Sequence, residues 1–496
     1  MSTTESHASP QQSNAARNRW TLIAICAGTF MLLVDVTIVQ VALPTIQRHL
    51  GASFTDLQWV IDAYALSLAA LILTWGSISD RFGRKRVFIA GLTVFTLSSL
   101  LCGVAQSITM LIWSRALQGV GGAAMFATGL ALIAQDFQGP ARGKAIAAWG
   151  ATVGGAVAIG PLVGGLLTSG VGWRWIFIVN VPIGVAAIWL SWTKMRNQTD
   201  PGATRLDVFG LITFSAGMFL LELGLIKGNA LGWTSATILA MFGGSLVAFV
   251  TFVVAELHQT RPMFDLSLFR KPGFSGVSLA TFAVGGGMFA LMPYLTLYLQ
   301  NDLGNSPLGG GLRLLPMTIP TFLVPFLLRS PIHKLPPGLV LGGGVAITAG
   351  GIAAFLLVGA TSSWTVLILG MVLAGIGIGI ANPAIARVGL GVVPPERSGM
   401  ASGLSNTFRI GGLATGVAAL GAVFQQRITS SMSTSVGTQA GTIGRVISSA
   451  GVKAAAHGNA AVAAAARVAF VSGLHTIFVI GAIIVVVGAV AAAVLV

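Results

Sequence analysis

The chain has 496 residues, of which 54% are hydrophobic and only 8% are charged, and its mean hydropathy is +0.86. Ordinary soluble domains carry roughly 25% charged residues, so this composition excludes a soluble globular protein. The formal net charge of +15 does not indicate nucleic-acid binding, because the basic residues are scattered through short loops and not gathered on one polar face.

Long apolar runs recur through the chain, and a membrane-spanning helix needs about 20 predominantly apolar residues. Residues 1–19 are polar and without pattern, so we expect them to be disordered. The run that follows is too long for a signal-peptide core and is expected to remain as a span. Fourteen membrane helices are predicted, at residues 20–43, 57–75, 87–106, 109–135, 143–168, 175–193, 208–226, 235–256, 274–299, 308–329, 339–360, 365–388, 398–424 and 468–493.

The distribution of Lys and Arg predicts the orientation, since basic residues accumulate in cytoplasmic loops. If the odd-numbered spans run outward, basic residues are concentrated on the inner side, most densely at residues 81–86. The amino terminus is therefore expected in the cytoplasm, and an even number of spans returns the carboxyl terminus there. Residues 425–467, rich in Ser, Ala, Gly and Thr, are expected to form an outer loop.

A charged stretch between the second and third predicted helices reads Gly76-Ser-Ile-Ser-Asp80-Arg81-Phe-Gly83-Arg84-Lys85-Arg86. Its two glycines allow a sharp turn, and the Asp among basic residues indicates a charge clasp. Alternatively, Asp80 accepts hydrogen bonds from the free amides of the helix that starts near Ser398. The stretch resembles the G-x-L-A-D-R-x-G-R-K loop of the major facilitator superfamily of transporters. That resemblance implies a cytoplasmic gate made by Gly76, Asp80, Arg81, Gly83 and Arg84.

The chain also repeats itself, because residues 111–121 align with residues 367–377. Matching the fourth predicted helix to the twelfth implies two six-helix bundles with two helices inserted between them. We expect an N-terminal bundle at 20–193, inserted helices with their flanks at 194–273, and a C-terminal bundle at 274–496. The predicted fold is an all-α polytopic membrane protein with the major facilitator fold, whose site lies between the two halves near the midplane.

A Gly-Pro sequence stands out in the fifth predicted helix, at Gly160-Pro161-Leu-Val-Gly164-Gly165. Proline removes a backbone donor and bends a helix, and the glycines open a face for a partner. The segment resembles the antiporter signature G-x8-G-x3-G-P-x2-G-G, with Ala147 and Ala156 in two of the glycine positions. The resemblance implies that this helix seals a leak path between the two halves. Generic helix packing is the alternative role of such glycines.

Few ionisable residues lie within the predicted spans. Each costs about 2.5–3.5 kcal/mol at the centre of a membrane helix, so each is a candidate for a functional role. They are Asp35 in the first helix, Asp62 near the outer end of the second, Arg115 in the fourth, Glu222 in the seventh and Arg409 in the thirteenth. We expect them to carry proton or substrate coupling.

Each of these residues has a structural alternative. Asp35 and Arg115 would form a buried pair that only stabilises the bundle, and Asp62 would be an interfacial acid wetted from outside. Glu222 would face a partner helix or snorkel to the membrane surface. Arg409 would hold backbone carbonyls and Asn406.

Three further segments, 33–44, 111–123 and 173–184, read in order like motifs of the fourteen-helix drug:proton antiporters of the major facilitator superfamily. The first resembles L-D-x-T-I-V-N-V-A-L-P, with Gln40 in place of Asn. The second resembles L-x-x-x-R-x-x-Q-G-x-G-x-A, and the third resembles W-R-W-I-F-x-x-N-x-P-x-G. The resemblance implies a bacterial inner-membrane location and export of drugs in exchange for protons.

Other chemistry finds little support in the sequence. Residues 139–145 look faintly like a phosphate loop but lack its first Gly and its Ser or Thr, so ATP is not expected as a partner. Six scattered His residues predict no metal cluster, and no catalytic motif indicates an enzyme. We expect no cofactor apart from protons as the coupling ion, and no nucleic-acid partner.

The sequence thus predicts a secondary antiporter, functional as a monomer in membrane lipid, that exports amphipathic and cationic small molecules by alternating access. Asp35, with Asp62 as the second choice, would bind either a proton or the substrate cation. One alternative is a dedicated exporter of a single endogenous metabolite such as an antibiotic, lipid or siderophore. Another is a membrane scaffold without transport activity.

Overall fold

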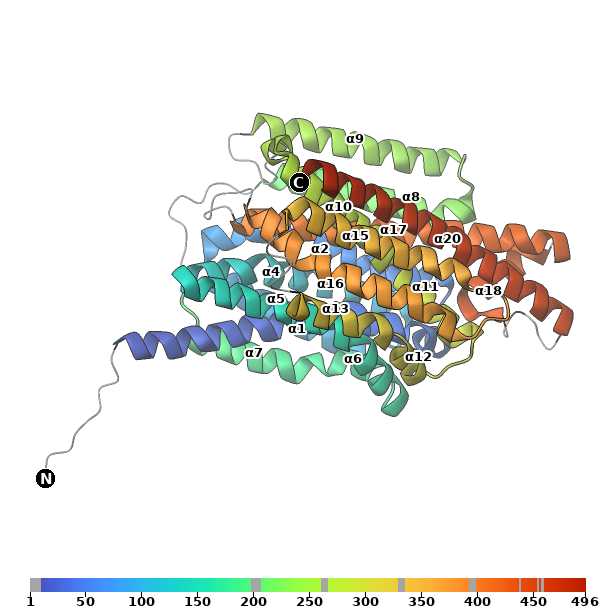
Figure 1. The fold of residues 1–496 in the computed structure, drawn as a ribbon, viewed down its shortest axis with the longest axis horizontal. Coiled ribbons are helices and arrows are strands. Elements are labelled where there is room, and N and C mark those ends of the chain that lie inside the picture. The colour runs from blue at the N-terminus through green and yellow to red at the C-terminus, as the bar shows by residue number, and fades with distance from the viewer. Residues whose placement is uncertain are drawn as a thin grey trace, which may run out of the picture.

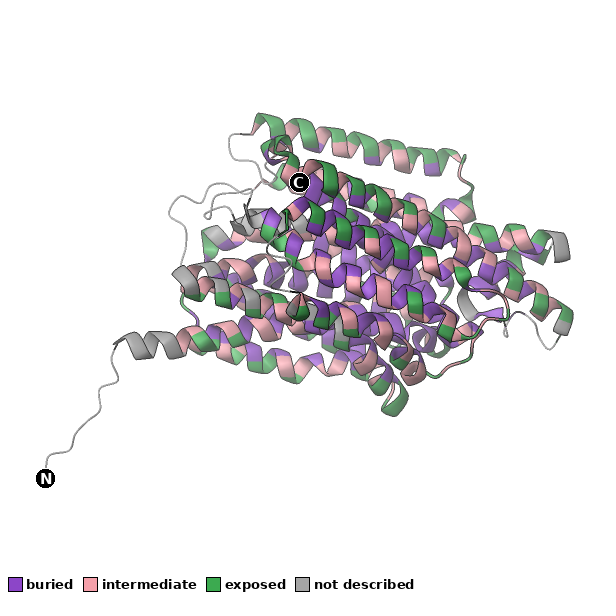
Figure 2. Cartoon of the chain, viewed as in Figure 1, coloured by how far each residue is buried: buried purple, intermediate pink, exposed green. Residues whose placement is uncertain are grey.

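The computed structural model describes residues 10–197, 207–259, 266–328, 335–391, 398–436, 439–452, 455 and 459–496. All regular structure within these residues is helical, and no strand occurs among them. The long helices run side by side as an elongated bundle (Figure 1). Buried residues fill its centre, and exposed ones gather on outer helices (Figure 2). A bundle of this kind satisfies every backbone polar group inside each helix, as a bilayer requires.

The N-terminal half begins with two long helices joined by a tight turn. The Ser53 side chain accepts from the Asp56 amide at 3.2 Å and the Asp56 carboxylate accepts from the Ser53 amide at 2.9 Å, so a capping box starts the second helix. Gly83 separates the second helix from the third with a φ of 101°, which favours glycine. The helices are α1 (Pro10–Leu50), α2 (Phe54–Phe82), α3 (Arg84–Gly103), α4 (Ile108–Asp136), α5 (Gly139–Gly170), α6 (Trp175–Ile178) and α7 (Asn180–Lys194).

Two helices, α8 (Val208–Leu231) and α9 (Ala236–His258), form a hairpin after the first seven. Asp207 caps α8 by accepting from the Gly210 amide at 2.8 Å. Burial disfavours the charged carboxylate and by itself would raise the Asp207 pKa. Hydrogen bonds from the Gln259 side chain and the Gly210 amide favour the charged form more strongly, so the Asp207 pKa lies below its ordinary value. α9 lies at the edge of the bundle and is mostly exposed (Figures 1 and 2), whereas α8 packs against α2 and α17.

The C-terminal half contains longer helices interrupted by short ones. Its elements are η1 (Leu266–Arg270), α10 (Pro272–Ala283), η2 (Val284–Met288), η3 (Phe289–Leu291), α11 (Met292–Leu297), η4 (Tyr298–Asp302), α12 (Pro307–Arg313), α13 (Leu315–Leu327), α15 (Pro337–Ala354), η5 (Phe355–Leu357), η6 (Trp364–Val366), α16 (Leu367–Gly391), α17 (Ser398–Val436), α18 (Ala440–Ala450) and α20 (Ala460–Leu495). The last helix, α20, runs back toward the end of the bundle from which α1 starts (Figure 1).

The helix predicted at 274–299 lies within one apolar helical stretch, Pro272–Asp302, whose hydrogen-bond pattern changes along its length. It changes to a π-helical turn at η2 and a 3-10 turn at η3 before α11 resumes. Three successive glycines cause the change, since they allow neighbouring backbones to approach closely. A Cβ at Gly285 would lie 2.3 Å from the Arg409 carbonyl of α17, and one at Gly287 would lie 2.7 Å from the Gly481 carbonyl of α20.

Glycines of the sequence repeat hold equivalent helices together in the two halves. A Cβ at Gly119 of α4 would lie 2.4 Å from the Tyr64 carbonyl of α2. At the matching position of the repeat, a Cβ at Gly375 of α16 would lie 2.2 Å from the Met317 carbonyl of α13. Both contacts admit only a glycine, because a side chain there would displace a backbone carbonyl.

The next glycine of the repeat behaves in the same way. A Cβ at Gly121 would lie 2.8 Å from the Gly91 carbonyl of α3, and one at Gly377 would lie 2.5 Å from the Gly344 carbonyl of α15. The three helices α2, α3 and α4 are therefore packed like α13, α15 and α16. The short sequence match thus corresponds to a repeated three-helix arrangement.

Two segments predicted to lack regular structure contain helices. α1 begins at Pro10, so the expected disorder of residues 1–19 does not hold for its second half, and residues 1–9 lie outside the described residues. Within 425–467, α17 continues to Val436, α18 follows, and α20 starts at Ala460. The part from Ala460 onward is Ala-rich and favours helix by composition, whereas residues 425–436 are rich in Ser and Thr and are helical as the continuation of α17. The segment projects from the end of the bundle opposite the start of α1 (Figure 1).

Eleven helices in the described part of the chain are long and apolar enough to cross a membrane, and two shorter apolar helices, Ile159–Gly170 and Leu315–Pro325, accompany them. Each predicted span coincides with helix in the structure, although several ends differ by up to twelve residues. The division into fourteen spans, grouped as six, two and six, stays a prediction.

We predict that Gly121→Ala destabilises the protein by about 1–3 kcal/mol, because its Cβ would lie 2.5 Å from the backbone nitrogen of Phe95. The matched control is Gly150→Ala in α5, where a Cβ meets no atom within 4 Å. Thermal unfolding of the purified variants in detergent measures the difference. Equal melting temperatures for the two variants would contradict the close packing of α4 against α3 at Gly121.

Candidate functional site

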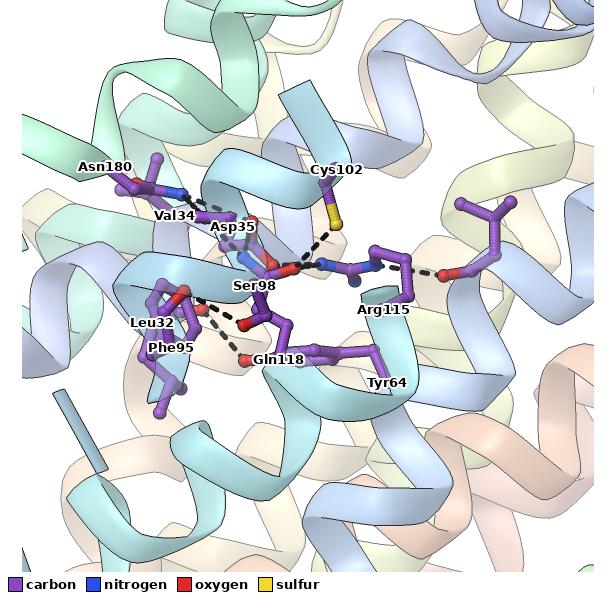
Figure 3. A network of polar contacts seen from close by, with 12 residues as sticks. Leu32, Val34, Asp35, Tyr64, Phe95, Ser98, Cys102, Arg115, Gln118 and Asn180 are labelled. Atoms are coloured by element: carbon purple, nitrogen blue, oxygen red, sulfur yellow. Dashed lines mark hydrogen bonds and ion pairs between the residues drawn. The ribbon is translucent and has the colours of Figure 1, made fainter. Parts of the chain in front are cut away.

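A polar network fills the interior of the N-terminal helices around Asp35 of α1 (Figure 3). Arg115 of α4 forms an ion pair with Asp35 through Nη1 and Oδ2. Gln118 Nε2 donates to Asp35 Oδ1 at 2.9 Å, and Asn180 Nδ2 of α7 donates to the same oxygen at 3.4 Å. Asp35 is completely buried, so its charge is balanced by these donors and not by water.

Further contacts fix the Arg115 side chain in place. Its Nε donates to the Val60 carbonyl of α2 at 3.1 Å, and its Nη1 also donates to Gln118 Oε1 at 2.6 Å. The guanidinium carbon lies 4.2 Å from the centroid of the Tyr64 ring, which adds a cation–π contact. Ser99 Oγ of α3 accepts from Gln118 at 2.7 Å and from Asn180 at 2.9 Å. The network therefore joins five helices through one ion pair.

The network lies apart from the cavity between the N-terminal and C-terminal helices. That cavity is lined by Thr37, Gln40, Val41, Pro161, Phe289, Met292, Thr296, Leu314, Met317 and Thr318. Thr37, Gln40 and Val41 of α1 line this cavity. They lie two, five and six positions after Asp35, so at 3.6 residues per turn they are on a different face of the helix from Asp35. None of the cavity's lining residues is charged, and its volume of about 10 Å³ holds about one water molecule in this conformation. Asp35 faces neither this cavity nor the surface of the bundle.

Asp62 of α2 faces the opposite half of the molecule. It belongs to a stripe at four-residue spacing with Phe54 and Gln58. The Phe54 ring centroid lies 6.3 Å from that of Tyr294 on α11, and Gln58 Nε2 donates to the Val417 carbonyl of α17 at 3.3 Å. Asp62 is completely buried and therefore not an acid wetted from outside, which excludes that alternative.

Glu222 of α8 is also completely buried, which excludes the snorkelling alternative. Its Oε1 accepts from Thr415 Oγ1 of α17 at 3.1 Å. Arg409, six residues before Thr415 on α17, is half-buried. Its Nη2 donates to Asn406 Oδ1 at 2.8 Å, which agrees with the structural alternative for this residue. The five ionisable candidates thus separate into the Asp35–Arg115 pair, the two acids at the α2–α8–α17 contact, and Arg409.

The structure describes the side chains of some of the predicted gate residues. Arg84 Nη1 donates to the Ala131 carbonyl of α4 at 3.3 Å, and the Arg81 guanidinium carbon lies 5.4 Å from the Phe82 ring centroid. The space beside Gly83 is filled by the Asn197 side chain. The Asp80 side chain lies outside the described residues, so its clasp and its contact with the start of α17 stay predictions.

The Gly-Pro segment of α5 lies between α1 and α12. A Cβ at Gly164 would lie 2.9 Å from the Ile38 carbonyl of α1, and one at Gly165 would lie 2.8 Å from the Pro307 carbonyl at the start of α12. From the other side, a Cβ at Gly311 of α12 would lie 2.4 Å from the Pro161 carbonyl. These glycines bring the two halves of the chain into direct backbone contact, with no room for solvent.

Sequence reasoning missed several polar side chains around the acids. Gln58, Ser99, Tyr294 and Thr415 carry hydroxyl or amide groups, which are common in membrane helices and therefore do not stand out in the sequence. One signal was available, because the chain has only three Tyr residues. All three, Tyr64, Tyr294 and Tyr298, are buried in the structure. No group of three metal-ligating side chains occurs among the described residues.

We predict that Asp35→Asn and Arg115→Gln each destabilise the protein by about 3–5 kcal/mol, since each leaves a buried charge without its partner. The double variant is expected to recover part of this loss, because neither charge remains. Thermal unfolding in detergent measures all three, with the exposed Arg48→Gln as a control that changes stability by less than about 0.5 kcal/mol. Strictly additive losses would rule out the pair as a coupled unit.

Comparisons with known proteins agree with this architecture. The chain is 34% identical to multidrug resistance protein Stp of Mycobacterium tuberculosis over 404 residues, 81% of this chain and 75% of that protein. It is also 34% identical to the tetracenomycin C resistance and export protein of Streptomyces glaucescens, over 86% of this chain and 80% of that one. The inward-facing, unoccupied structure of a bacterial homolog of the human lysosomal transporter Spinster has the same fold, with 19% identity, a TM-score of 0.64 and 98% of each chain covered.

A sequence profile described as Major Facilitator Superfamily matches residues 25–419, which span most of the helices. The buried ionisable residues, the repeated three-helix packing and the absence of strands in the described part all fit that description. The chain is therefore a multi-pass membrane transporter and not an enzyme, and it belongs to the Major Facilitator Superfamily.

Proposed function

We propose that this transporter exports amphipathic, cationic compounds in exchange for protons, by alternating access between its two halves. The observation that carries the proposal is the buried Asp35–Arg115 pair, held by Gln118 in the interior of membrane helices. Ionisable residues at such positions are costly, and in membrane proteins they commonly mark ion pathways. The names of the relatives, which concern antibiotic and multidrug resistance, support export as the direction.

Protonation of Asp35 would change the network chemically. A neutral carboxyl no longer balances the Arg115 guanidinium, so Arg115 and Gln118 would seek other partners. Since Arg115 also holds the Val60 carbonyl of α2, a change in its position would be transmitted to α2. A proton that enters down the membrane potential supplies about 2.3 kcal/mol per 100 mV for this change.

The cargo would occupy the region between the two halves. The small cavity there would have to widen as the halves move apart, and its uncharged walls, including Phe289 and Met292, would then accept the apolar part of a compound. Contacts of α5 with α1 and α12 would seal the path beside it. We place both termini on the cytoplasmic side of a bacterial inner membrane, with the protein acting as a monomer and without ATP. The positive-inside distribution of Lys and Arg supports this orientation.

A second candidate is a dedicated exporter of one endogenous metabolite. It is favoured by two relatives whose names specify a single antibiotic, the tetracenomycin C resistance and export protein and a methylenomycin A resistance protein. Competition among chemically unrelated cations for efflux separates the two candidates. Mutual inhibition supports a multidrug exporter, and transport of one compound without competition supports a dedicated one.

We predict that Asp35→Asn lowers proton-driven transport by at least about tenfold while the protein stays folded. Purified protein in liposomes, with an imposed pH gradient and ethidium as the cation, measures the rate. The matched control is Asp56→Asn at the capping box. The side-chain oxygen of Asn can still accept the hydrogen bond from the Ser53 backbone amide, so transport is expected to be unchanged. Full transport by Asp35→Asn with unchanged pH dependence would exclude the proposed role of Asp35. If neither the variants nor the wild-type protein transport the cation, a membrane scaffold without transport activity is favoured.

A further inference from the structure

Two further buried acids, Asp62 and Glu222, lie where α2, α8 and α17 come together. α17 contacts both helices near these acids. Its Thr415 hydroxyl donates to Glu222 Oε1 at 3.1 Å. Its Val417 carbonyl accepts from Gln58 Nε2 at 3.3 Å, and Gln58 lies one turn before Asp62 on α2. The α2–α8 contact includes the same turns, since the ring centroids of Trp59 and Phe219 are 6.2 Å apart. The two carboxyl groups are close enough to interact electrostatically.

Most of the carboxyl oxygens of this pair have no partner. Both oxygens of Asp62 and Oε2 of Glu222 are buried and accept no hydrogen bond from the described residues. A buried polar atom without a partner costs about 1–3 kcal/mol, and more if it is charged. Asp35 shows the contrast, because each of its oxygens has a donor. Three of the four carboxyl oxygens are therefore left to accept a donor that the described residues do not supply.

The titratable and charged groups around the pair do not neutralise it. Tyr294 of α11 is the remaining titratable group that acts on Asp62 in the described part, and its hydroxyl donates to the Val417 carbonyl at 2.7 Å. Arg115 of α4 reaches α2 at Val60 but is paired with Asp35. Arg409 of α17 donates to Asn406. No positive side chain among the described residues acts on either acid.

Two carboxylates in a dry site without a counter-cation do not both stay ionised. We propose that Asp62 and Glu222 form a single-cation site, which holds one proton when empty and the positive group of the cargo when loaded. The exchange conserves charge, because one proton leaves as one cationic group arrives. The inference rests on the proposed function and deepens it, since the inserted helix α8 supplies half of the cation site.

The neighbouring side chains fit such an occupant. The rings of Trp59 and Phe219, three residues before Asp62 and Glu222, pack against each other, and aromatic faces attract organic cations by about 0.5–2 kcal/mol. A second aromatic contact, Phe54 with Tyr294, joins α2 to α11. α9 packs chiefly on α8, whereas α8 packs on α2 and α17, so the role of the hairpin in binding falls on α8.

The test is equilibrium binding of tetraphenylphosphonium, a lipophilic cation without an ionisable proton, to the full-length protein in detergent. Titration calorimetry at pH 7 in two buffers of different ionisation enthalpy gives both the affinity and the number of protons released. We expect wild-type protein to release about one proton on binding. Asp62→Asn and Glu222→Gln are each expected to abolish the release and to weaken binding by at least about tenfold.

Two controls separate a site role from a structural one. Glu256→Gln makes the same change at another buried acid of the hairpin, on α9, and is expected to bind and release like wild type. Glu222→Asp keeps a carboxylate, and it is expected to retain proton release even if Glu222→Gln does not fold. A folded Glu222→Asp that binds the probe without proton release would overturn the proposal.

Other results would also overturn it. One is that the wild-type protein binds no probe, or binds it without releasing a proton. Another is that Glu222→Gln binds the probe and releases a proton like wild type, whether or not Asp62→Asn is impaired. Binding needs no pH gradient, so the outcome is independent of the liposome assay. Proton release that depends on the pair, together with absent proton-driven transport, would support the cation site and refute the proposed antiport. Intact release in Asp35→Asn would support two separate roles for the two acidic sites.

Discussion

A charge inside a bilayer-spanning helix must be neutralised by a partner, because hydrocarbon offers no water to do so. This constraint organises the interior of the protein. At Asp35 it is met internally, since Arg115, Gln118 and Asn180 approach the carboxylate from two other helices. At Asp62 it is not met by any described residue. The first arrangement is a closed unit that a proton can disrupt, and the second is open to an incoming cation.

The distances between helices depend on glycine. Gly119 and Gly121 bring α4 against α2 and α3, so that the Arg115 side chain, one turn earlier on α4, reaches both Asp35 and the Val60 carbonyl. Larger residues would move α4 outward and leave the ion pair separated. Without a hydrophobic driving force between helices in lipid, such close packing by dispersion is what holds membrane bundles together.

The hairpin of α8 and α9 has two unequal members. α9 is mostly exposed and contacts chiefly α8, as a helix facing lipid does. α8 packs on α2 and α17, and it places Glu222 and Phe219 at the junction of the two halves. Since Asn229 of α8 also donates to the Ala422 carbonyl of α17 at 2.6 Å, the hairpin is fixed to the C-terminal half at more than one level. An alternating movement of the halves would therefore change the surroundings of Glu222.

The sequence by itself determined the helical membrane class, the positions of the helices, the repeat and the short list of ionisable candidates, because hydropathy, charge and glycine spacing are local properties. It also indicated the Asp35–Arg115 pair as one alternative. Only the tertiary structure decided that Asp62 and Glu222 lie together, that α10 gives way to a π-helical turn, and that helix continues into residues 425–436. These features arise where residues far apart in the chain meet, through backbone contacts such as Gly285 with Arg409. Residue spacing along one helix carries no information about which neighbour will face it.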